Sequence, residues 1–265
     1  MTPDEIAVAA QALVEAERTN TQMRLISGGH PDMNMDDAYA VQARVVAAKE
    51  AAGARRVGWK IGLTSRAMQQ ALGIDIPDSG VLFEDMVFET GGRVAAGRFI
   101  QPRVEAEIAF VLKSDITGAA TRDQVLAATD YVCASLEILD TRIVRVDPDT
   151  GATRKVFDTI ADNAANAGVV LGQARHAPGA GNLRWIGALV SRDDSIEETG
   201  LGGGVLGDPV MGLVWLSERL GQYGDVMRAG DIVLSGSFIR PIECPPGTRI
   251  EADFGDFGEV AISFD

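Results

Sequence analysis

From residue 55 onward, the chain consists of short apolar runs separated by glycine, proline and aspartate. Runs of this length with turn residues between them are typical of β-strands. Such short strands favour a largely antiparallel or mixed sheet over a doubly wound fold, in which strands alternate with long helices. We predict strands at 57–62, 104–113, 132–139, 167–172, 184–191, 231–236, 249–254 and 258–264.

The first 53 residues have a helical pattern instead. Thr2 and Glu5 form a capping box in front of an apolar helical face. Further helices are predicted from near Asn34 to Gly53, after a second capping box at Thr121–Gln124, and from Asp208 to Leu220 with Gly221 as its end. We therefore predict an α+β fold with a small N-terminal helical region at 1–53 and a β-rich catalytic domain at 54–265.

The acidic composition restricts the partners of the protein. Its 265 residues include 24 basic and 38 acidic side chains, which give a net charge of −14. This charge argues against nucleic acid or an anionic membrane as a partner, and an anionic substrate would need local positive charge. The N-terminus lacks a signal-peptide pattern, and no stretch approaches the roughly 18 apolar residues of a membrane span, so we expect a cytoplasmic enzyme.

Histidine and cysteine are too scarce for several common kinds of catalytic site. The two histidines, His30 and His176, lie in turn-rich sequence, which excludes a multi-histidine zinc site and disfavours a serine–histidine–aspartate triad. Cys133 and Cys244 do not suggest a disulfide framework. Acid–base chemistry must therefore rest mainly on carboxylates and lysines.

Three glutamates form a pattern that suits a metal site. In the run VEAEIAFVL, alternate residues form an apolar strand face, so Glu105 and Glu107 share the opposite face, about 7 Å apart. Taken alone, this pair is also typical of a strand face exposed to water. Glu137, however, lies inside the apolar run ASLEILD, where an unpaired charge is rare. Three carboxylates together suit a hard divalent cation, Mg²⁺ or Mn²⁺, and not zinc or copper.

Lys60 and Asp78 are the other candidates for chemistry. Lys60 lies within the apolar run VGWKIGLTS, where its ammonium group either reaches the surface or stays buried. Burial would lower its pKa and would allow proton transfer near neutrality. Asp78 lies in the turn-like sequence PDSG, for which capping of a turn is the alternative interpretation.

The order of the motifs resembles that of a known family. GWKIGLTS, PDSGVL, PRVEAEIAFVL, LEILD, DNAANAGVVLG and LSGSF follow one another as in the hydratase/decarboxylase branch of the fumarylacetoacetate hydrolase superfamily. These enzymes process 2-oxo acids made by meta-cleavage of aromatic rings, and the resemblance extends from residue 37 to the C-terminus. It implies a β-rich mixed roll with the N-terminal helices packed beside it, in a homo-oligomer such as a pentamer or decamer.

The resemblance also implies roles for individual residues. The three glutamates match the family's metal ligands, normally for Mg²⁺ with Mn²⁺ as a substitute. Lys60 and Asp78 match the acid–base positions, and Ser237 in LSGSF matches a residue near the carboxylate end of the substrate.

The expected substrate is a seven-carbon 2-oxo diacid, because the stretch RKVFDTIADNAANAG is most similar to members of the branch that hydrate one. Its distal carboxylate needs a cation. Arg154 and Lys155 are candidates within a basic cluster that also contains Arg142 and Arg145, although a solvated loop is the alternative interpretation. Other functions left open are hydration of a five-carbon 2-oxo acid, decarboxylation, carbon–carbon bond hydrolysis, and a non-catalytic role as partner of a pathway decarboxylase or aldolase.

Overall fold

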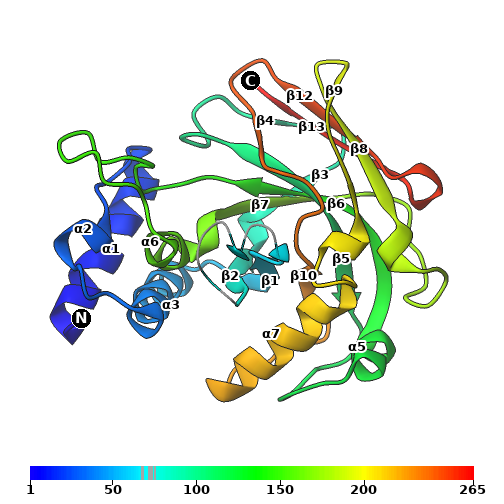
Figure 1. The fold of residues 1–265 in the computed structure, drawn as a ribbon, viewed down its shortest axis with the longest axis horizontal. Coiled ribbons are helices and arrows are strands. Elements are labelled where there is room, and N and C mark those ends of the chain that lie inside the picture. The colour runs from blue at the N-terminus through cyan, green and yellow to red at the C-terminus, as the bar shows by residue number, and fades with distance from the viewer. Residues whose placement is uncertain (67–68, 71–73, 75) are drawn as a thin grey trace.

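Two curled β-sheets and a group of helices make up the protein (Figure 1). The computed structural model describes residues 1–66, 69–70, 74 and 76–265. The larger, eight-stranded sheet has the order β2-β1-β10-β5-β6-β7-β3, and β11 pairs with the start of β5. Its strands are β1 (Arg56–Gly62), β2 (Asp78–Phe83), β3 (Val87–Glu89), β5 (Arg103–Leu112), β6 (Thr129–Leu139), β7 (Asn166–Leu171), β10 (Ile232–Leu234) and β11 (Ile242–Glu243).

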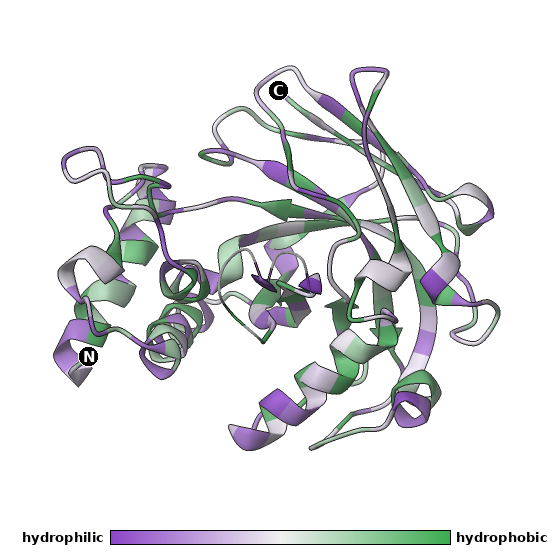
Figure 2. Ribbon diagram, in the orientation of Figure 1, coloured by the Kyte–Doolittle hydropathy of each residue, from purple (hydrophilic) through white to green (hydrophobic). Residues whose placement is uncertain are grey.

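The smaller sheet and two helices cover one face of the larger sheet. This five-stranded sheet has the order β4-β13-β12-β8-β9. Its strands are β4 (Gly92–Val94), β8 (Gly187–Arg192), β9 (Ser195–Leu201), β12 (Arg249–Asp253) and β13 (Glu259–Phe264). Its apolar side chains share the main hydrophobic core with α5 (Arg122–Ala128) and α7 (Val210–Gln222). The middle of α7 is hydrophobic, whereas its C-terminal end is hydrophilic (Figure 2).

The two faces of β5 carry different residues, as the alternation predicts. Residues from Val104 to Phe110 at even positions are fully buried in the main core. The opposite face carries Glu105, Glu107 and Ala109. Ala109 belongs to a small buried apolar cluster, whose other members are Leu82, Cys133, Val169 and Leu234. The glutamates therefore lie beside an apolar patch inside the curl of the larger sheet.

Two asparagines join β2 to the beginning of β7. Val81 donates its backbone N–H to Asn163 Oδ1 at 2.8 Å, and its carbonyl accepts from Asn163 Nδ2 and Asn166 Nδ2, both at 2.9 Å. Asn163, Ala164 and Ala165 all have left-handed φ angles, of 50°, 53° and 59°. Since this conformation costs a residue other than glycine roughly 1–2 kcal/mol, the junction stores strain. It brings two distant strands of the sheet together.

The N-terminal helices form a second hydrophobic core and support β2. They are α1 (Pro3–Thr19), α2 (Ile26–Gly29) and α3 (Met35–Ala51), and they pack with α6 (Val156–Ala161). From α3, Gln42 Nε2 donates to the carbonyls of Ser79 and Ile160, both at 2.9 Å. The hydroxyl of Tyr39 accepts from the backbone N–H of Ser79 at 3.1 Å. These bonds fix the strand that begins at Asp78.

The structure confirms the α+β class and most predicted elements, with several differences. Asp78 does not cap a turn but begins β2, because residues 78–83 pair with β1. The strand predicted at 184–191 begins later, after a 3-10 helix at Leu183–Trp185, and α7 continues through Gly221 to Gln222. The helices α2 and α6 and the strands β3, β4, β9 and β11 were not predicted. Among the described residues, no helix has the length and apolar character needed to span a membrane.

Candidate metal centre

The pairing of β5 with β6 brings the three predicted glutamates together. Glu105 lies directly opposite Glu137, and Glu107 lies opposite Ser135. One carboxylate oxygen from each glutamate lies within 4.8 Å of those of the other two. Glu107 and Glu137 are fully buried, and Glu105 is half-buried. The alternative that the Glu105–Glu107 pair faces water is therefore wrong.

These carboxylates lack enough partners within the protein. Among the described residues, Glu107 Oε1 and both carboxylate oxygens of Glu137 have no hydrogen-bond partner, although Lys60 Nζ lies 3.3 Å from Glu137 Oε1 as an ion pair. Burial and the carboxylate of Glu137 raise the pKa of Glu105 to about 8, and the same two causes raise the pKa of Glu107 well above its usual value. Buried carboxylate oxygens without donors fit a hard divalent cation.

The pairing of β1 with β2 places Lys60 and Asp78 beside this cluster. Gly62 pairs with Asp78, and Lys60 pairs with Gly80. Both charged side chains are buried, with 3% of Lys60 and 2% of Asp78 exposed, so Lys60 does not reach the surface. A Cβ atom on Gly62 would collide with Asp78 Oδ1 and would lie 2.9 Å from Lys60 Nζ. The absent side chain of Gly62 is therefore what allows these two groups to converge.

The predicted direction of the Lys60 pKa is wrong. Burial lowers this pKa, but the carboxylates of Glu137, Asp78, Glu105 and Glu107 together outweigh burial and raise it above its usual value. Burial raises the pKa of Asp78, with Lys60 opposing the shift. The sequence showed that Lys60 lies in an apolar run, but it did not show how many carboxylates surround the ammonium group.

A tight turn after β10 supplies the one backbone donor to the glutamates found in the described part of the chain. Gly236 donates its N–H to Glu107 Oε2 at 2.7 Å. Its φ of +116° favours glycine, and a Cβ atom there would collide with the side chain of Thr64. The next residue, Ser237, is half-buried, and its hydroxyl donates to the carbonyl of Ile239 at 2.9 Å. Ser237 thus follows a residue that contacts the cluster, while its own hydroxyl bonds within the turn.

The basic cluster predicted between residues 142 and 155 has members in different environments. Arg154 is half-buried and donates to the carbonyl of Ile143 at 3.3 Å. Lys155 is exposed and precedes α6 as its N-cap residue. Neither side chain contacts the glutamates through a hydrogen bond or ion pair in the described residues.

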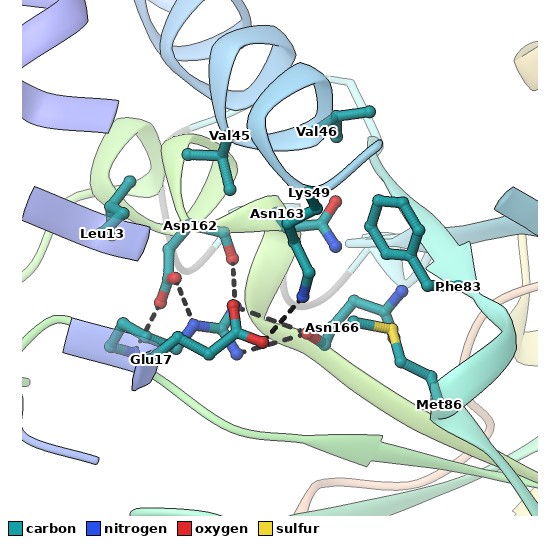
Figure 3. Close-up of a pocket in the computed structure, with 11 residues that line it drawn as sticks. Leu13, Glu17, Val45, Val46, Lys49, Phe83, Met86, Asp162, Asn163 and Asn166 are labelled. Carbon is teal, nitrogen blue, oxygen red and sulfur yellow. Dashed lines mark hydrogen bonds and ion pairs between the residues drawn. The ribbon is translucent and has the colours of Figure 1, made fainter. Parts of the chain in front are cut away.

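Arg142 forms a buried ion pair beside a cavity between the N-terminal helices and the larger sheet. Its Nε donates to Asp162 Oδ1 at 2.5 Å, and its backbone N–H donates to Asp162 Oδ2 at 2.8 Å. Figure 3 shows Glu17, Asp162 and Asn166 gathered around this cavity. Its free volume is about 10 Å³, which is only enough for about one water molecule. This cavity therefore does not accommodate a substrate.

Sequence reasoning missed three residues around the glutamates: Gly62, Gly236 and Arg103. Arg103 is half-buried and lies on the same face of β5 as Glu105, two residues away. The period-2 alternation that linked the two glutamates would also have included this arginine. The roles of the two glycines depend on strand pairing, which the sequence alone does not fix.

Comparisons with known proteins give a consistent set of relatives, although no family model matches the chain. The chain is 46% identical to a 2-oxo-hept-4-ene-1,7-dioate hydratase from Escherichia coli, over 96% of each protein. It is 38% identical to a 2-keto-4-pentenoate hydratase from Paraburkholderia xenovorans, over 100% of this chain and 97% of that one.

A solved structure from the same group has a very similar fold. This is 4-oxalocrotonate decarboxylase from Pseudomonas putida G7, complexed with magnesium and adipate. The TM-score is 0.93 at 28% sequence identity, and the match covers 100% of this chain and 99% of the decarboxylase. The similarity therefore includes the N-terminal helices as well as both sheets.

Proposed function

The chain belongs to the hydratase/decarboxylase branch of the fumarylacetoacetate hydrolase superfamily, and from this premise we propose that it is a metal-dependent hydro-lyase. It adds water to 2-oxohept-4-ene-1,7-dioate and gives 4-hydroxy-2-oxoheptanedioate, in the meta-cleavage catabolism of homoprotocatechuate. The 46% identity to the hydratase from Escherichia coli supports this substrate. The observation that carries the proposal is the cluster of three glutamates, of which Glu107 and Glu137 are fully buried and have unpaired carboxylate oxygens.

In this proposal, Glu105, Glu107 and Glu137 hold Mg²⁺, for which Mn²⁺ can substitute. Carboxylate oxygens are the ligands that both ions prefer. The similarity to a decarboxylase that was solved with magnesium supports the choice of metal. When bound, the ion would supply Lewis-acid stabilisation of the 2-oxo acid end of the substrate.

Lys60 and Asp78 share the proton transfers. Removal of a proton from C3 and delivery of a proton to C5 moves the double bond next to the 2-oxo group. Water then adds its hydroxyl to C4 and a proton is delivered to C3. The convergence of the two side chains at Gly62 supports their joint action, and such acid–base help is typically worth roughly 10²–10⁴-fold in rate.

The remaining candidates bind the carboxylate groups of the substrate. Ser237 acts near a carboxylate end, next to Gly236, which contacts Glu107. Arg154 and Lys155 provide positive charge for the distal carboxylate. Replacing Arg154 or Lys155 with methionine should raise KM for the seven-carbon diacid more than for 2-oxopent-4-enoate, in steady-state assays of both substrates. Equal increases for both substrates would remove these residues from the proposal.

Assays of three 2-oxo acids test the reaction itself. Purified protein with Mg²⁺ would be incubated separately with 2-oxohept-4-ene-1,7-dioate, 2-oxopent-4-enoate and 4-oxalocrotonate, with the products identified by mass spectrometry. We expect hydration of the seven-carbon diacid with the highest kcat/KM and loss of activity on removal of the metal with a chelator. Release of CO₂ from 4-oxalocrotonate as the main activity would favour a decarboxylase, and inactivity on all three would favour a non-catalytic partner subunit.

Three further expectations from the sequence stay predictions. They are the division of the chain after residue 53, the cytoplasmic location, and assembly as a homo-oligomer such as a pentamer or decamer, including its association with a pathway decarboxylase or aldolase.

A further inference from the structure

We propose that the guanidinium of Arg103 binds the distal carboxylate of the substrate and so selects a seven-carbon diacid over shorter or uncharged 2-oxo acids. This inference rests on the proposed function, because it adds Arg103 to Arg154 and Lys155 as a group that recognises the second carboxylate. Arg103 lies within the motif PRVEAEIAFVL, but the resemblance implied no role for it.

The position of Arg103 relative to the glutamates supports this role. Arg103, Glu105 and Glu107 succeed one another on one face of β5, with each step covering about 7 Å along the strand. Arg103 lies opposite Leu139 of β6 and Glu243 of β11, beyond the pair formed by Glu105 and Glu137. It is therefore the first cation along this strand face on the outer side of the glutamates.

The length of the proposed substrate matches this spacing. Six carbon–carbon bonds of about 1.5 Å, at angles near 111°, separate the two terminal carbons of the extended diacid by roughly 7 Å. A 2-oxo acid end held near Glu105 would then present its distal carboxylate within reach of the long Arg103 side chain. A five-carbon mono-acid has no second carboxylate for this guanidinium to bind.

Arg103 is available for a ligand. It is half-buried, yet its guanidinium forms no hydrogen bond or ion pair with any residue that the structure describes. By contrast, the buried guanidinium of Arg142 is paired with Asp162. A guanidinium that is partly removed from water without a partner is costly, and its planar fork suits a carboxylate.

Two more arginines increase the positive charge around Arg103. Arg145 Nη1 lies 3.9 Å from Glu243 Oε1, on the residue opposite Arg103, and Arg154 donates its backbone N–H to the carbonyl of Arg145 at 2.9 Å. The positive charges of Arg103, Arg145 and Arg154 are close enough to repel one another. The carboxylates of Glu105, Glu243 and Asp140 also lie near Arg103. An anionic ligand would relieve the repulsion among these cations.

Binding of two saturated analogues tests the inference without turnover. They are 2-oxoheptanedioate and 2-oxoheptanoate, which have the same length but differ in the distal carboxylate. Their Kd values would be measured by titration calorimetry with Mg²⁺ present. For Arg103→Met we expect the Kd of 2-oxoheptanedioate to rise roughly 10- to 100-fold, as for loss of a charge-assisted hydrogen bond, with little change for 2-oxoheptanoate. Arg103→Lys should lose less affinity for 2-oxoheptanedioate, because lysine keeps the positive charge but lacks the planar guanidinium.

The control is Arg249→Met, which removes an exposed arginine paired with Glu251 in the smaller sheet and should change neither Kd. Equal weakening of both analogues by Arg103→Met would overturn the inference, because it would indicate a general effect on the site. If Arg103→Met does not fold, the same comparison with Arg103→Lys decides the question.

The two proposals can fail separately. A wild-type protein that hydrates the seven-carbon diacid, with binding unaffected by loss of Arg103, would overturn only the inference. A protein that binds 2-oxoheptanedioate through Arg103 but converts none of the three 2-oxo acids would overturn only the proposed function.

Discussion

The molecule contains two buried clusters of charged side chains. They differ in how many of their charged atoms have hydrogen-bond partners within the chain. Around Arg142 and Asp162, guanidinium and carboxylate are joined by short hydrogen bonds, and neither side chain has an orphaned polar atom. Around Glu107 and Glu137, four carboxylates including Asp78 and Glu105 surround one ammonium group, that of Lys60. Several of their oxygens have no hydrogen-bond partner in the described residues.

This difference separates a structural role from a functional one. A buried ion pair that is complete within the chain mainly stabilises the arrangement of the elements that carry it. Buried carboxylates that repel one another reduce the stability of the fold unless a ligand such as a metal cation binds them. Such groups are concentrated at functional sites. The comparison predicts that removing a charge from the glutamate cluster will lower activity, whereas removing a charge from the Arg142–Asp162 pair will lower stability.

The largest effect is expected for Glu107→Gln. Loss of one carboxylate should weaken metal binding and lower kcat/KM by roughly 10³-fold, which corresponds to about 4 kcal/mol of lost transition-state stabilisation. The free energy of unfolding should stay the same or rise, because a buried charge is removed while an oxygen remains for Gly236. Steady-state kinetics and urea denaturation measure the two quantities, with Glu251→Gln on the smaller sheet as the control. Near-normal activity of the variant without added metal would contradict the functional role of the glutamate cluster.

The next effect is expected for Arg142→Met and concerns stability. Removing one partner leaves Asp162 buried without its cation, which typically costs about 3–5 kcal/mol of unfolding free energy. The folded fraction should keep its kcat/KM within about threefold, because Arg142 lies in a different cluster from the glutamates. Adding Asp162→Asn should restore part of the stability, since no unpaired buried charge then remains. A specific loss of activity in the folded protein would contradict the structural assignment.

The smallest of these effects is a pH dependence that belongs to Asp162. Burial outweighs the attraction of Arg142 and raises the pKa of Asp162 from 3.8 to about 6. The folded protein therefore binds this proton more readily than the unfolded chain. Its contribution to stability is greatest below about pH 4 and is lost as the pH rises through about 6, by at most about 3 kcal/mol.

Unfolding free energies of the wild type and Asp162→Asn, measured by urea denaturation across this range, isolate that contribution. The wild type should lose stability with rising pH relative to the variant. Parallel curves for the two proteins would show that Arg142 fully offsets burial of the carboxylate.

The sequence predicted those parts of the fold and site that depend on local periodicity. Alternation along β5 placed Glu105 and Glu107 on one face, and the structure confirms this placement. The same alternation places Arg103 on this face, but a basic residue does not belong to the acidic pattern that indicates a metal site. The polar strand β9, with the sequence SIEETGL, had no apolar signal because most of its residues are exposed.

Strand pairing limited the rest of the prediction. That Glu137 would lie opposite Glu105, and Asp78 opposite Gly62, follows from register between distant segments, which one sequence does not reveal. The raised pKa of Lys60 depends on the same pairings. Local patterns thus identified the right residue types, whereas their energetics required the tertiary structure.

The asparagine junction between β2 and β7 affects when the site can form during synthesis of the chain. A chain synthesised as far as residue 150 already contains Lys60, Asp78 and the three glutamates. It still lacks Asn163 and Asn166, which join the two strands, and Gly236, which donates to Glu107. The residues for chemistry thus emerge from the ribosome well before the segments that lock them in place, and the site matures only near the end of translation.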